Sequence, residues 1–394
     1  MSHTNISMSS PDLTDAERSA VLDVLNTPTL SMGHWVSDFE NAFRKWTGRA
    51  EAIAVSSGTS GLHLCVRAAG IKAGDLVITT PFSFVASANV LLYEGAIPIF
   101  VDVDPRSGNL DPESVAMAAR DLSTGGAAAR RWLPRDGAAG EHPLRGILTV
   151  DVFGQPSDLD AIHATAEQFS LALIEDACEA LGAEYKSRLA GSVGETAVFA
   201  FYPNKQITTG EGGMIVTDDK AAASFMKALR NQGRAPGDTW LQHTHLGYNY
   251  RLDEMSAALG TVQMTRLEEL LQKREQVAAW YGARLQSMEG VRPPTPEPYT
   301  TRMSWFVYVV HFDPEIDRDR LAARLADRRI PVRPYFLPIH LQPYMVERFG
   351  FREGDFPVTE DLGRRGLALP FSGIMSEDEV EAVCNALQQE LVLV

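Results

Sequence analysis

Short apolar runs alternate with helical patterns between about residue 50 and residue 230, and this alternation limits the folds that the chain can adopt. Each run is as short as a buried strand, and the segments between the runs carry apolar residues at helical spacing. Strands that alternate with helices predict an α/β fold with a mostly parallel sheet. The expected strands lie in 52–57, 75–84, 97–104, 146–154, 171–178, 195–203 and 213–219, and the expected helices include 60–70, 86–95 and 158–170.

The composition argues against several classes of function. The chain has 394 residues and a formal net charge of −15, which disfavours a general surface for nucleic acid or anionic membranes. Its three cysteines are widely spaced without a CxxC pair, so neither a disulfide framework nor a zinc site is expected. The first residues lack the basic and apolar regions of a signal peptide, and no apolar stretch is long enough to span a membrane. We therefore expect a cytoplasmic protein without a nucleic-acid or membrane partner.

The remaining segments predict a second, smaller domain. Residues 123–144 are rich in Gly, Ala and Arg without a clear period, and we interpret them as a surface insertion. A single long helical pattern runs from Asp253, its expected N-cap, to about Ser287 and is long enough to bridge two domains. The proline-rich stretch 291–298 breaks this pattern, and the tail combines strand and helix patterns. The expected division is a large domain with the central sheet over 1–270 and a small α+β domain over 271–394.

Three short segments at expected strand ends could carry chemistry, because ligands of parallel sheets bind beyond the carboxyl ends of the strands. The segment SSGTSG (56–61) opens a helix, where N–H groups, glycine and hydroxyls suit a phosphate, although it could be an ordinary N-cap. Asp176 ends an apolar run and needs a partner, either a protonated ring nitrogen or a structural cap or salt bridge. Lys205 lies between two expected strands. Its side chain could be a reactive amine held in a cleft, or it could be an exposed surface lysine.

Taken together, the three segments match the needs of pyridoxal phosphate. This cofactor requires a phosphate anchor, an acid opposite its pyridine nitrogen and a lysine amine that forms a Schiff base with it. Phe84, at another strand end, supplies an aromatic ring that could stack on the cofactor, or it could belong to the core.

Many motifs along nearly the whole chain, apart from 123–144, resemble those of the DegT/DnrJ/EryC1/StrS sugar aminotransferases. They are LSMGHWVSDFENAF, GTSGLHL, PFSFVASANV, FVDVDP, EDACEALGAEY, FAFYPNKQITTGEGGMIVTDD, LGYNYRLDEMSAALG, PYFLPIHLQPY and GDFPVTEDLGRRGLALP. The resemblance implies the fold type I architecture of pyridoxal-phosphate-dependent aminotransferases, with a mostly parallel mixed sheet in the large domain. It also implies a homodimer whose active sites lie at the subunit interface.

The resemblance assigns roles at the cofactor. Lys205 matches the Schiff-base lysine, and Asp176 matches the acid that pairs with the pyridinium nitrogen. The phosphate-binding turn of the family is matched by Gly58, Thr59 and Ser60.

Further residues are matched around this centre. Phe84 stands where an aromatic ring stacks on the cofactor, and Asn249 matches the asparagine that reaches the partner's cofactor phosphate. Arg251 lies nearby and could face that interface or an anionic substrate. Tyr335 and His340 could line the sugar pocket or make structural contacts in the small domain.

Two positions depart from the commonest pattern of the family. Glu179 stands where many members carry glutamine near the phenolic oxygen of the cofactor, and a glutamate there repels an oxyanion unless one of the two is protonated. Ala200 stands where many members carry a serine or threonine that donates to the cofactor, and Ser57 or water could replace that donor.

The resemblance also narrows the reaction. Related dehydratases replace the Schiff-base lysine with histidine, so the lysine at 205 favours transamination. The tail most resembles perosamine-synthase-like 4-aminotransferases, which implies a nucleotide-linked 4-keto-6-deoxyhexose as acceptor and L-glutamate as donor, with 2-oxoglutarate released. The alternatives are a 3-aminotransferase acting on a 3-keto nucleotide sugar and a non-catalytic regulatory protein of the same fold.

Overall fold

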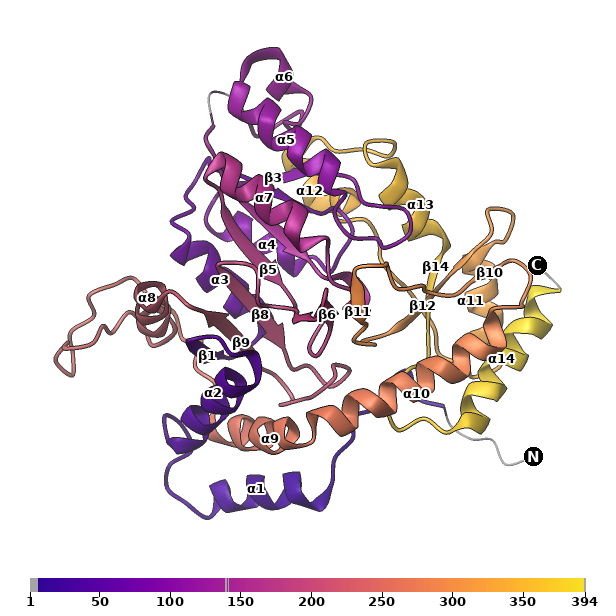
Figure 1. Cartoon of the computed structure of the whole chain (residues 1–394), viewed down its shortest axis with the longest axis horizontal. Coiled ribbons are helices and arrows are strands. Elements are labelled where there is room, and N and C mark those ends of the chain that lie inside the picture. Colours follow the sequence, from indigo (N-terminus) through magenta and orange to yellow (C-terminus); the bar gives the residue numbers. More distant parts are fainter. Residues whose placement is uncertain (1–5, 139, 141, 393–394) are drawn as a thin grey trace.

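A seven-stranded sheet forms the centre of the protein, as the computed structural model of residues 6–138, 140 and 142–392 shows (Figure 1). The strand order is β1-β9-β8-β5-β4-β2-β3, and β9 is the one strand of this sheet that runs opposite to the other six. The predicted α/β fold with a mostly parallel sheet is therefore confirmed. The strands are β1 (Glu51–Val55), β2 (Leu76–Thr79), β3 (Ile97–Phe100), β4 (Leu144–Val150), β5 (Ala172–Asp176), β8 (Thr196–Ala200) and β9 (Gly213–Thr217).

Helices cover both faces of the central sheet, because the side chains of each strand alternate between two apolar layers. In β1, Ile53 and Val55 belong to the layer under α3, whereas Ala52 and Ala54 pack with α2. One face is covered by α3 (Gly58–Ala68), α4 (Ala86–Tyr93) and α8 (Lys220–Arg230), and the other by α2 (His34–Thr47), α5 (Pro112–Thr124) and α7 (Leu159–Phe169). This sandwich leaves the carboxyl ends of the parallel strands as the place where a ligand can bind.

A smaller antiparallel sheet lies toward the C-terminus and is packed against α10, α11 and α14 (Figure 1). Its order is β10-β12-β14-β13, with β10 (Val291–Arg292), β12 (Tyr308–Phe312), β13 (Arg333–Pro334) and β14 (Gly366–Leu369). A third sheet joins β6 (Glu184–Tyr185), β7 (Arg188–Leu189) and β11 (Thr300–Arg302). The other elements are α1 (Asp15–Leu25), α6 (Gly126–Arg130), α9 (Glu254–Thr265), α10 (Leu267–Leu285), α11 (Arg318–Asp327), α12 (Pro343–Phe349), α13 (Pro357–Arg365), α14 (Glu377–Leu391) and the 3₁₀ turns Val152–Gly154 and Ile339–Leu341.

The helix α10 connects the two larger sheets. Leu267 and Leu271 near its start pack in the layer of the central sheet, whereas Tyr281 and Leu285 near its end pack against the smaller sheet. This arrangement fits the expected two-domain organisation, and the boundary at residue 270 stays a prediction.

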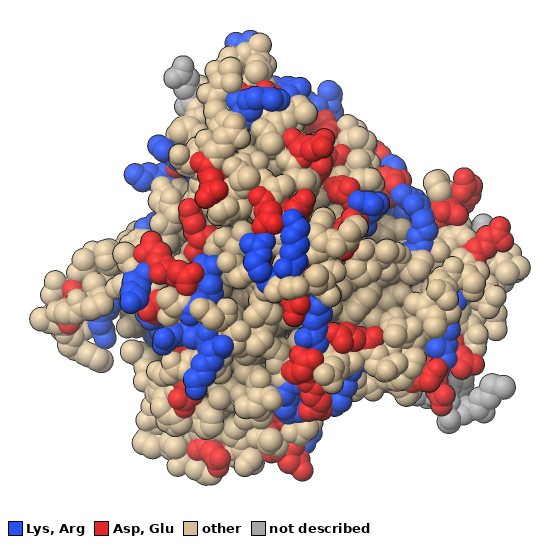
Figure 2. All heavy atoms as spheres, viewed as in Figure 1, with Lys and Arg blue, Asp and Glu red and all other residues tan. Residues whose placement is uncertain are grey.

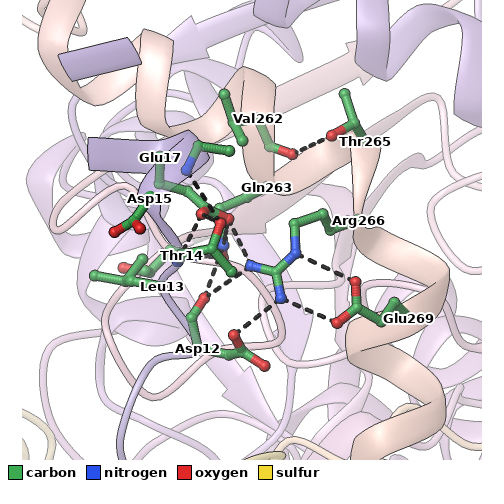
Figure 3. Close-up of polar contacts among 12 residues, drawn as sticks. Asp12, Leu13, Thr14, Asp15, Glu17, Val262, Gln263, Thr265, Arg266 and Glu269 are labelled. Carbon is green, nitrogen blue, oxygen red and sulfur yellow. Dashed lines mark hydrogen bonds and ion pairs between the residues drawn. The ribbon is translucent and has the colours of Figure 1, made fainter. Parts of the chain in front are cut away.

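The single long helix predicted from Asp253 to about Ser287 is wrong, because the helix is broken at Arg266. Arg266 has φ −106° and ψ 4°, and it ends α9 and precedes α10. Its guanidinium donates to Glu17 Oε1 (2.7 Å) and Asp12 Oδ1 (2.9 Å) of the N-terminal segment, as Figure 3 shows. This anchoring fixes Arg266 at the break. The expected N-cap is confirmed, since the Asp253 side chain accepts from the backbone N–H of Ser256.

The segment 123–144 contains more regular structure than we expected. It includes the end of α5 and the short helix α6, and its Trp132 and Leu133 pack against the apolar layer under α5. Arg135 holds it to the C-terminal part of the chain through a two-pronged contact of 2.6 Å with each oxygen of Asp355. The described part of the segment is therefore held against the rest of the protein through Trp132, Leu133 and Arg135.

The surface carries acidic and basic side chains side by side. Figure 2 shows both signs interspersed over one face of the protein, without a large area of a single sign. No helix in the described ranges is both long and apolar enough to pass through a membrane.

Candidate active site

A cavity of about 490 Å³ lies where the parallel strands end, and it collects most of the residues that the sequence singled out. Strands β4, β5 and β8 end at its floor, and the first turn of α3 forms one side. Phe306, Tyr335 and Phe336 close it from the C-terminal part of the chain. The predicted site residues that line it are Gly58, Thr59, Phe84, Asp176, Glu179, Lys205 and Tyr335.

Lys205 is held inside this cavity, so the alternative of an exposed surface lysine does not apply. Only 12% of its side chain is exposed, and its backbone N–H donates to Tyr202 O (2.9 Å) in the turn that follows β8. The Nζ atom lies 3.8 Å from Glu179 Oε1 and 3.7 Å from the centre of the Phe306 ring. The amine therefore has few neighbours with which it forms short contacts, and it points into the space that a ligand would occupy.

Arg274, which no sequence pattern singled out, holds the backbone of Lys205 in place. This arginine of α10 is buried, and it donates to the carbonyl oxygens of Lys205 (2.6 Å) and Asn204 (3.1 Å). It also donates to the carbonyl of Phe306 (3.3 Å), so one guanidinium ties together both segments that surround the amine. Burial lowers the pKa of Arg274 to about 10.

Asp176 presents its carboxylate at the end of β5, as predicted. It is 5% exposed, and its two oxygens accept from the Ser87 hydroxyl (2.8 Å) and the Cys178 N–H (3.2 Å). Neither partner is cationic, so the charge of this carboxylate is not neutralised by these contacts. A protonated ring nitrogen in the cavity would supply the missing positive partner.

Glu179 lies opposite Lys205 in a buried position. Its Oε2 accepts from the Phe153 N–H at 2.8 Å, and its Oε1 faces the lysine. Burial raises the pKa of Glu179 above its usual range, and the positive charge of Lys205 opposes this rise. The protonated carboxyl is thus favoured more than for an exposed glutamate, which eases the repulsion that we expected between Glu179 and an oxyanion.

Glu179→Gln should remove a pH-dependent part of the stability while keeping the shape and the acceptor for Phe153. Because folding raises the pKa of Glu179, its neutral form contributes stability at low pH, and this contribution is lost as the pH rises above the usual glutamate range near 4.5. The free energy of unfolding changes by about 1.4 kcal/mol for each unit by which the pKa differs between the folded and the unfolded protein. We expect the unfolding temperature of the cofactor-free wild type, relative to the variant, to fall with rising pH. The exposed Glu289→Gln is the control and should show no such trend.

The first turn of α3 forms a cradle suited to a phosphate. A Cβ at Gly58 would lie 2.8 Å from the Cβ of Ala200 and 2.9 Å from Cys178 Sγ, so only glycine fits there. Ser57 caps the helix, and the Ser60 hydroxyl oxygen closes the capping box by accepting from the Ser57 N–H (2.9 Å). Ser60 therefore stabilises the turn, and it does not line the cavity with Gly58 and Thr59. The N–H groups of such a first turn have no partner within the helix and can bind an anion.

The aromatic residues of the cavity divide into a free ring and a packed wall. Phe84 is 62% exposed, so it is not part of the core and its ring is available for stacking on a ligand. Tyr335 is stacked on Phe336, with ring centres 4.7 Å apart. These two rings form a rigid apolar side of the cavity.

Besides Ser60, three predicted site residues lie outside the cavity of a single chain. Asn249 is exposed, and Arg251 donates to Asn231 Oδ1 at 3.0 Å. His340 is fully buried, with its Nε2 at 3.0 Å from Glu360 Oε1, and burial lowers its pKa. His340 therefore does not line the cavity. Its contact with Glu360 is a structural contact, which was the alternative to a role in the sugar pocket.

The cavity fits pyridoxal phosphate on its own geometry. It combines a helix start that only glycine can form, an unneutralised buried carboxylate, an exposed ring and a lysine amine. Within the described part of the chain, Lys205 is the one cationic side chain that lines it. A phosphate dianion would thus depend on uncharged donors, namely the N–H groups of α3 and the Thr59 hydroxyl, and on cations from outside this chain.

Comparisons with known proteins agree with this geometry. The family model of the DegT/DnrJ/EryC1/StrS aminotransferases matches residues 11–388. A GDP-perosamine synthase of Caulobacter vibrioides is 37% identical over 391 residues, covering 98% of both chains. A pleiotropic regulatory protein of Geobacillus stearothermophilus is 32% identical and covers 94% of this chain and 93% of its own. The solved structure of PseC from Helicobacter pylori, an aminotransferase of pseudoaminic acid biosynthesis, has a TM-score of 0.88 at 26% identity and covers 99% of this chain and 100% of its own.

Proposed function

We propose an amino acceptor and an amino donor for this protein, which belongs to the DegT/DnrJ/EryC1/StrS aminotransferase family and is a pyridoxal-phosphate-dependent sugar aminotransferase. The proposed acceptor is a nucleotide-linked 4-keto-6-deoxyhexose, and the proposed donor is L-glutamate. The GDP-perosamine synthase, at 37% identity over nearly the whole chain, supports this acceptor. The observation that carries the catalytic assignment is the Lys205 amine inside the cavity that also holds Asp176.

Residues that line the cavity would hold the cofactor. Bound pyridoxal phosphate supplies an electron sink that stabilises negative charge on the carbon next to the transferred amino group. The N–H groups at Gly58 and Thr59 would bind its phosphate, and Phe84 would cover one face of its ring. Asp176 would keep a proton on its ring nitrogen, because an adjacent carboxylate favours the charged form of a base.

Lys205 would move the protons of both half-reactions. Its amine would accept a proton from the α-carbon of glutamate and later deliver one to the sugar carbon that receives the amino group. Glu179 lies 3.8 Å from this amine and could hold a proton for it, since burial favours its protonated form. The apolar wall of Phe306, Tyr335 and Phe336 would keep water from competing with these transfers.

The substrate is tested by an assay of purified holoenzyme with L-glutamate and a panel of 4-keto and 3-keto nucleotide sugars. We expect an amino-sugar product from the nucleotide-linked 4-keto-6-deoxyhexose, and one molecule of 2-oxoglutarate released for each molecule of this product. Turnover confined to 3-keto sugars would identify the alternative aminotransferase. Cofactor binding without turnover of any acceptor would favour a regulatory role. This role is the second candidate because the Geobacillus relative is named a pleiotropic regulatory protein. The cytoplasmic location inferred from the sequence stays a prediction.

We further propose that the protein acts as a homodimer with shared active sites. Trp240, Leu241 and Leu246 are 77%, 83% and 80% exposed on the segment that leads to Asn249. Exposed apolar residues gathered on one segment are typical of an interaction surface. Among the described residues, the cavity of one chain has no cation besides Lys205, so Asn249 and Arg251 of the partner subunit are suited to complete the phosphate site.

A mixture of Asn249→Asp and Lys205→Ala subunits should recover activity that neither variant has alone. In a hybrid dimer, one site carries both changes and the other carries neither, if Asn249 serves the partner's site. Random mixing gives hybrids for half of the dimers, so about a quarter of the wild-type activity is expected. Activity no greater than that of the separate variants, in a mixture shown to contain hybrids, would contradict the shared site.

A further inference from the structure

A second cavity, of about 670 Å³, is lined by segments of the chain on both sides of the proline-rich stretch. Its lining includes residues 105–108 and 152–153 from the region of the central sheet, and 291–298 and His311 from the region of the smaller sheet. It shares no lining residue with the candidate active site. The mechanism proposed above does not use it.

The walls of the second cavity are largely apolar. Phe82, Phe153, Val307 and Val309 line it, and these side chains are buried in the protein. The rings of Phe82 and Phe153 meet edge to face, with centres 5.9 Å apart. The prolines within 291–298 add further rigid, apolar surfaces to the lining. Such walls suit a planar aromatic body, which stacks without losing hydrogen bonds.

Arginines supply the charge of this cavity. Arg106, Arg292 and Arg365 line it, and within the described residues Glu297 is the one acidic side chain that does so. Arg106 pairs with Glu297 at 2.7 Å, Arg292 lies 3.5 Å from Asp313, and Arg365 is paired with Asp361. The side chain of Arg292 is 58% exposed and its ion pair is long, so it can turn toward an anion.

His311 adds a buried polar atom without a partner. It lies on β12 in the lining of the cavity, and its Nε2 makes no hydrogen bond. Burial, together with the charges of Arg365 and Arg292, lowers its pKa to about 4, so its ring is neutral near pH 7. A buried polar atom left unpaired is rare in a folded protein and calls for an explanation such as a missing ligand.

We propose that the second cavity binds a nucleoside phosphate. The base would lie between the Phe153 side and the prolines, and the phosphate would face Arg292 and Arg365, which bind phosphate oxygens well. The volume exceeds what a small dicarboxylate needs and lies within the range of sites for nucleotide-sized ligands. This site does not depend on the proposed function, because it uses none of the residues of the candidate active site.

Phe153 connects the two cavities. Its ring lines the second cavity and is stacked on Phe336 with centres 5.2 Å apart, while its N–H donates to Glu179 in the active site. A nucleotide that contacts this ring should therefore also slow hydrogen exchange in the turn 152–154.

Hydrogen–deuterium exchange of the holoenzyme with and without GDP tests the proposal. Protection is expected in 105–108, 291–298 and 152–154. Arg292→Ala and His311→Phe should each weaken this protection, with a Kd for GDP about tenfold higher. Arg320→Ala, an exposed arginine of α11 away from the cavity, is the matched control and should bind GDP as the wild type does. Inorganic phosphate and 2-oxoglutarate, which lack an aromatic body, should give no protection there.

Two results would overturn the proposal. One is protection by GDP that appears only in 57–60 and 199–212, which would place the nucleotide in the active site alone. The other is protection of 291–298 that is as strong with inorganic phosphate, or that is unchanged in Arg292→Ala and His311→Phe. Neither result bears on the keto-sugar assay, so the two proposals fail separately.

Discussion

Replacing Lys205 by alanine should abolish amino transfer, with kcat lowered by about 10⁴-fold or more, because one amine both binds the cofactor and moves the protons. The substitution leaves a small gap between Glu179 and the Phe306 ring, which the amine otherwise contacts. Arg274 holds the backbone of residue 205 through its carbonyl, so the loop should keep its position. Turnover and the visible absorbance of covalently bound cofactor, which borohydride reduction removes from the wild type, are the measurements.

Two further variants separate the chemistry of Lys205 from its charge. Lys205→Arg keeps a cation opposite Glu179 without a nucleophilic amine, and it should be as inactive as the alanine variant. Lys227→Ala removes a lysine of α8 that pairs with Glu51 at 2.7 Å outside the cavity, and it should retain activity within about twofold. Full turnover in either Lys205 variant would be incompatible with the proposed role of this residue.

The central fold could be predicted because local patterns determine it. Each strand of the sheet is an apolar run, and each crossover helix has its own apolar stripe, so neither depends on distant residues. The break at Arg266 could not be predicted in this way. It contains neither glycine nor proline, and its partners Asp12 and Glu17 lie more than two hundred residues earlier in the sequence. A contact over that distance leaves no periodic signal at the break itself.

The candidate site shows the same division between local and distant causes. Gly58, Asp176 and Lys205 were found because each follows an apolar run that predicts a strand, and because the three together match the needs of one cofactor. Ser87 and Arg274 were missed, since a serine on a helix and an arginine on a long helix are ordinary in sequence. Their importance follows only from the hydrogen bonds to Asp176 and to the Lys205 carbonyl.

Ala200 illustrates how a departure from the family pattern becomes understandable in the structure. Its methyl group lies against Gly58, where even one added carbon would approach to 2.8 Å. The side chain at this position therefore packs under the first turn of α3. The close packing makes the small residue a fitting choice, and in the proposed site it would leave phosphate binding to the N–H groups of the turn and to Thr59.

Asp176→Asn should lower kcat by about 10²–10³-fold, since an amide cannot hold a proton on the ring nitrogen as a carboxylate does. The change keeps the size of the side chain and an oxygen that can accept from Ser87, so folding and cofactor uptake should persist. Measured kcat for the glutamate half-reaction, beside the amount of bound cofactor, separates loss of chemistry from loss of binding. A variant that binds the cofactor fully and reacts at the wild-type rate would remove Asp176 from the mechanism.

Asp151 offers a matched control because it is also a buried carboxyl that follows a neighbouring strand. It is fully buried behind β4, and burial and the nearby Glu175 raise its pKa well above the usual range. The raised pKa favours the neutral carboxyl, which an amide closely imitates, so Asp151→Asn should change kcat by less than about threefold. The effect of Ser87→Ala should lie between those of the two other variants, with kcat lowered by about tenfold or less, because the Cys178 N–H still orients Asp176. This order of effects, with Asp176 far above Ser87 and Asp151, is expected only if the charge on Asp176 acts on a group bound in the cavity.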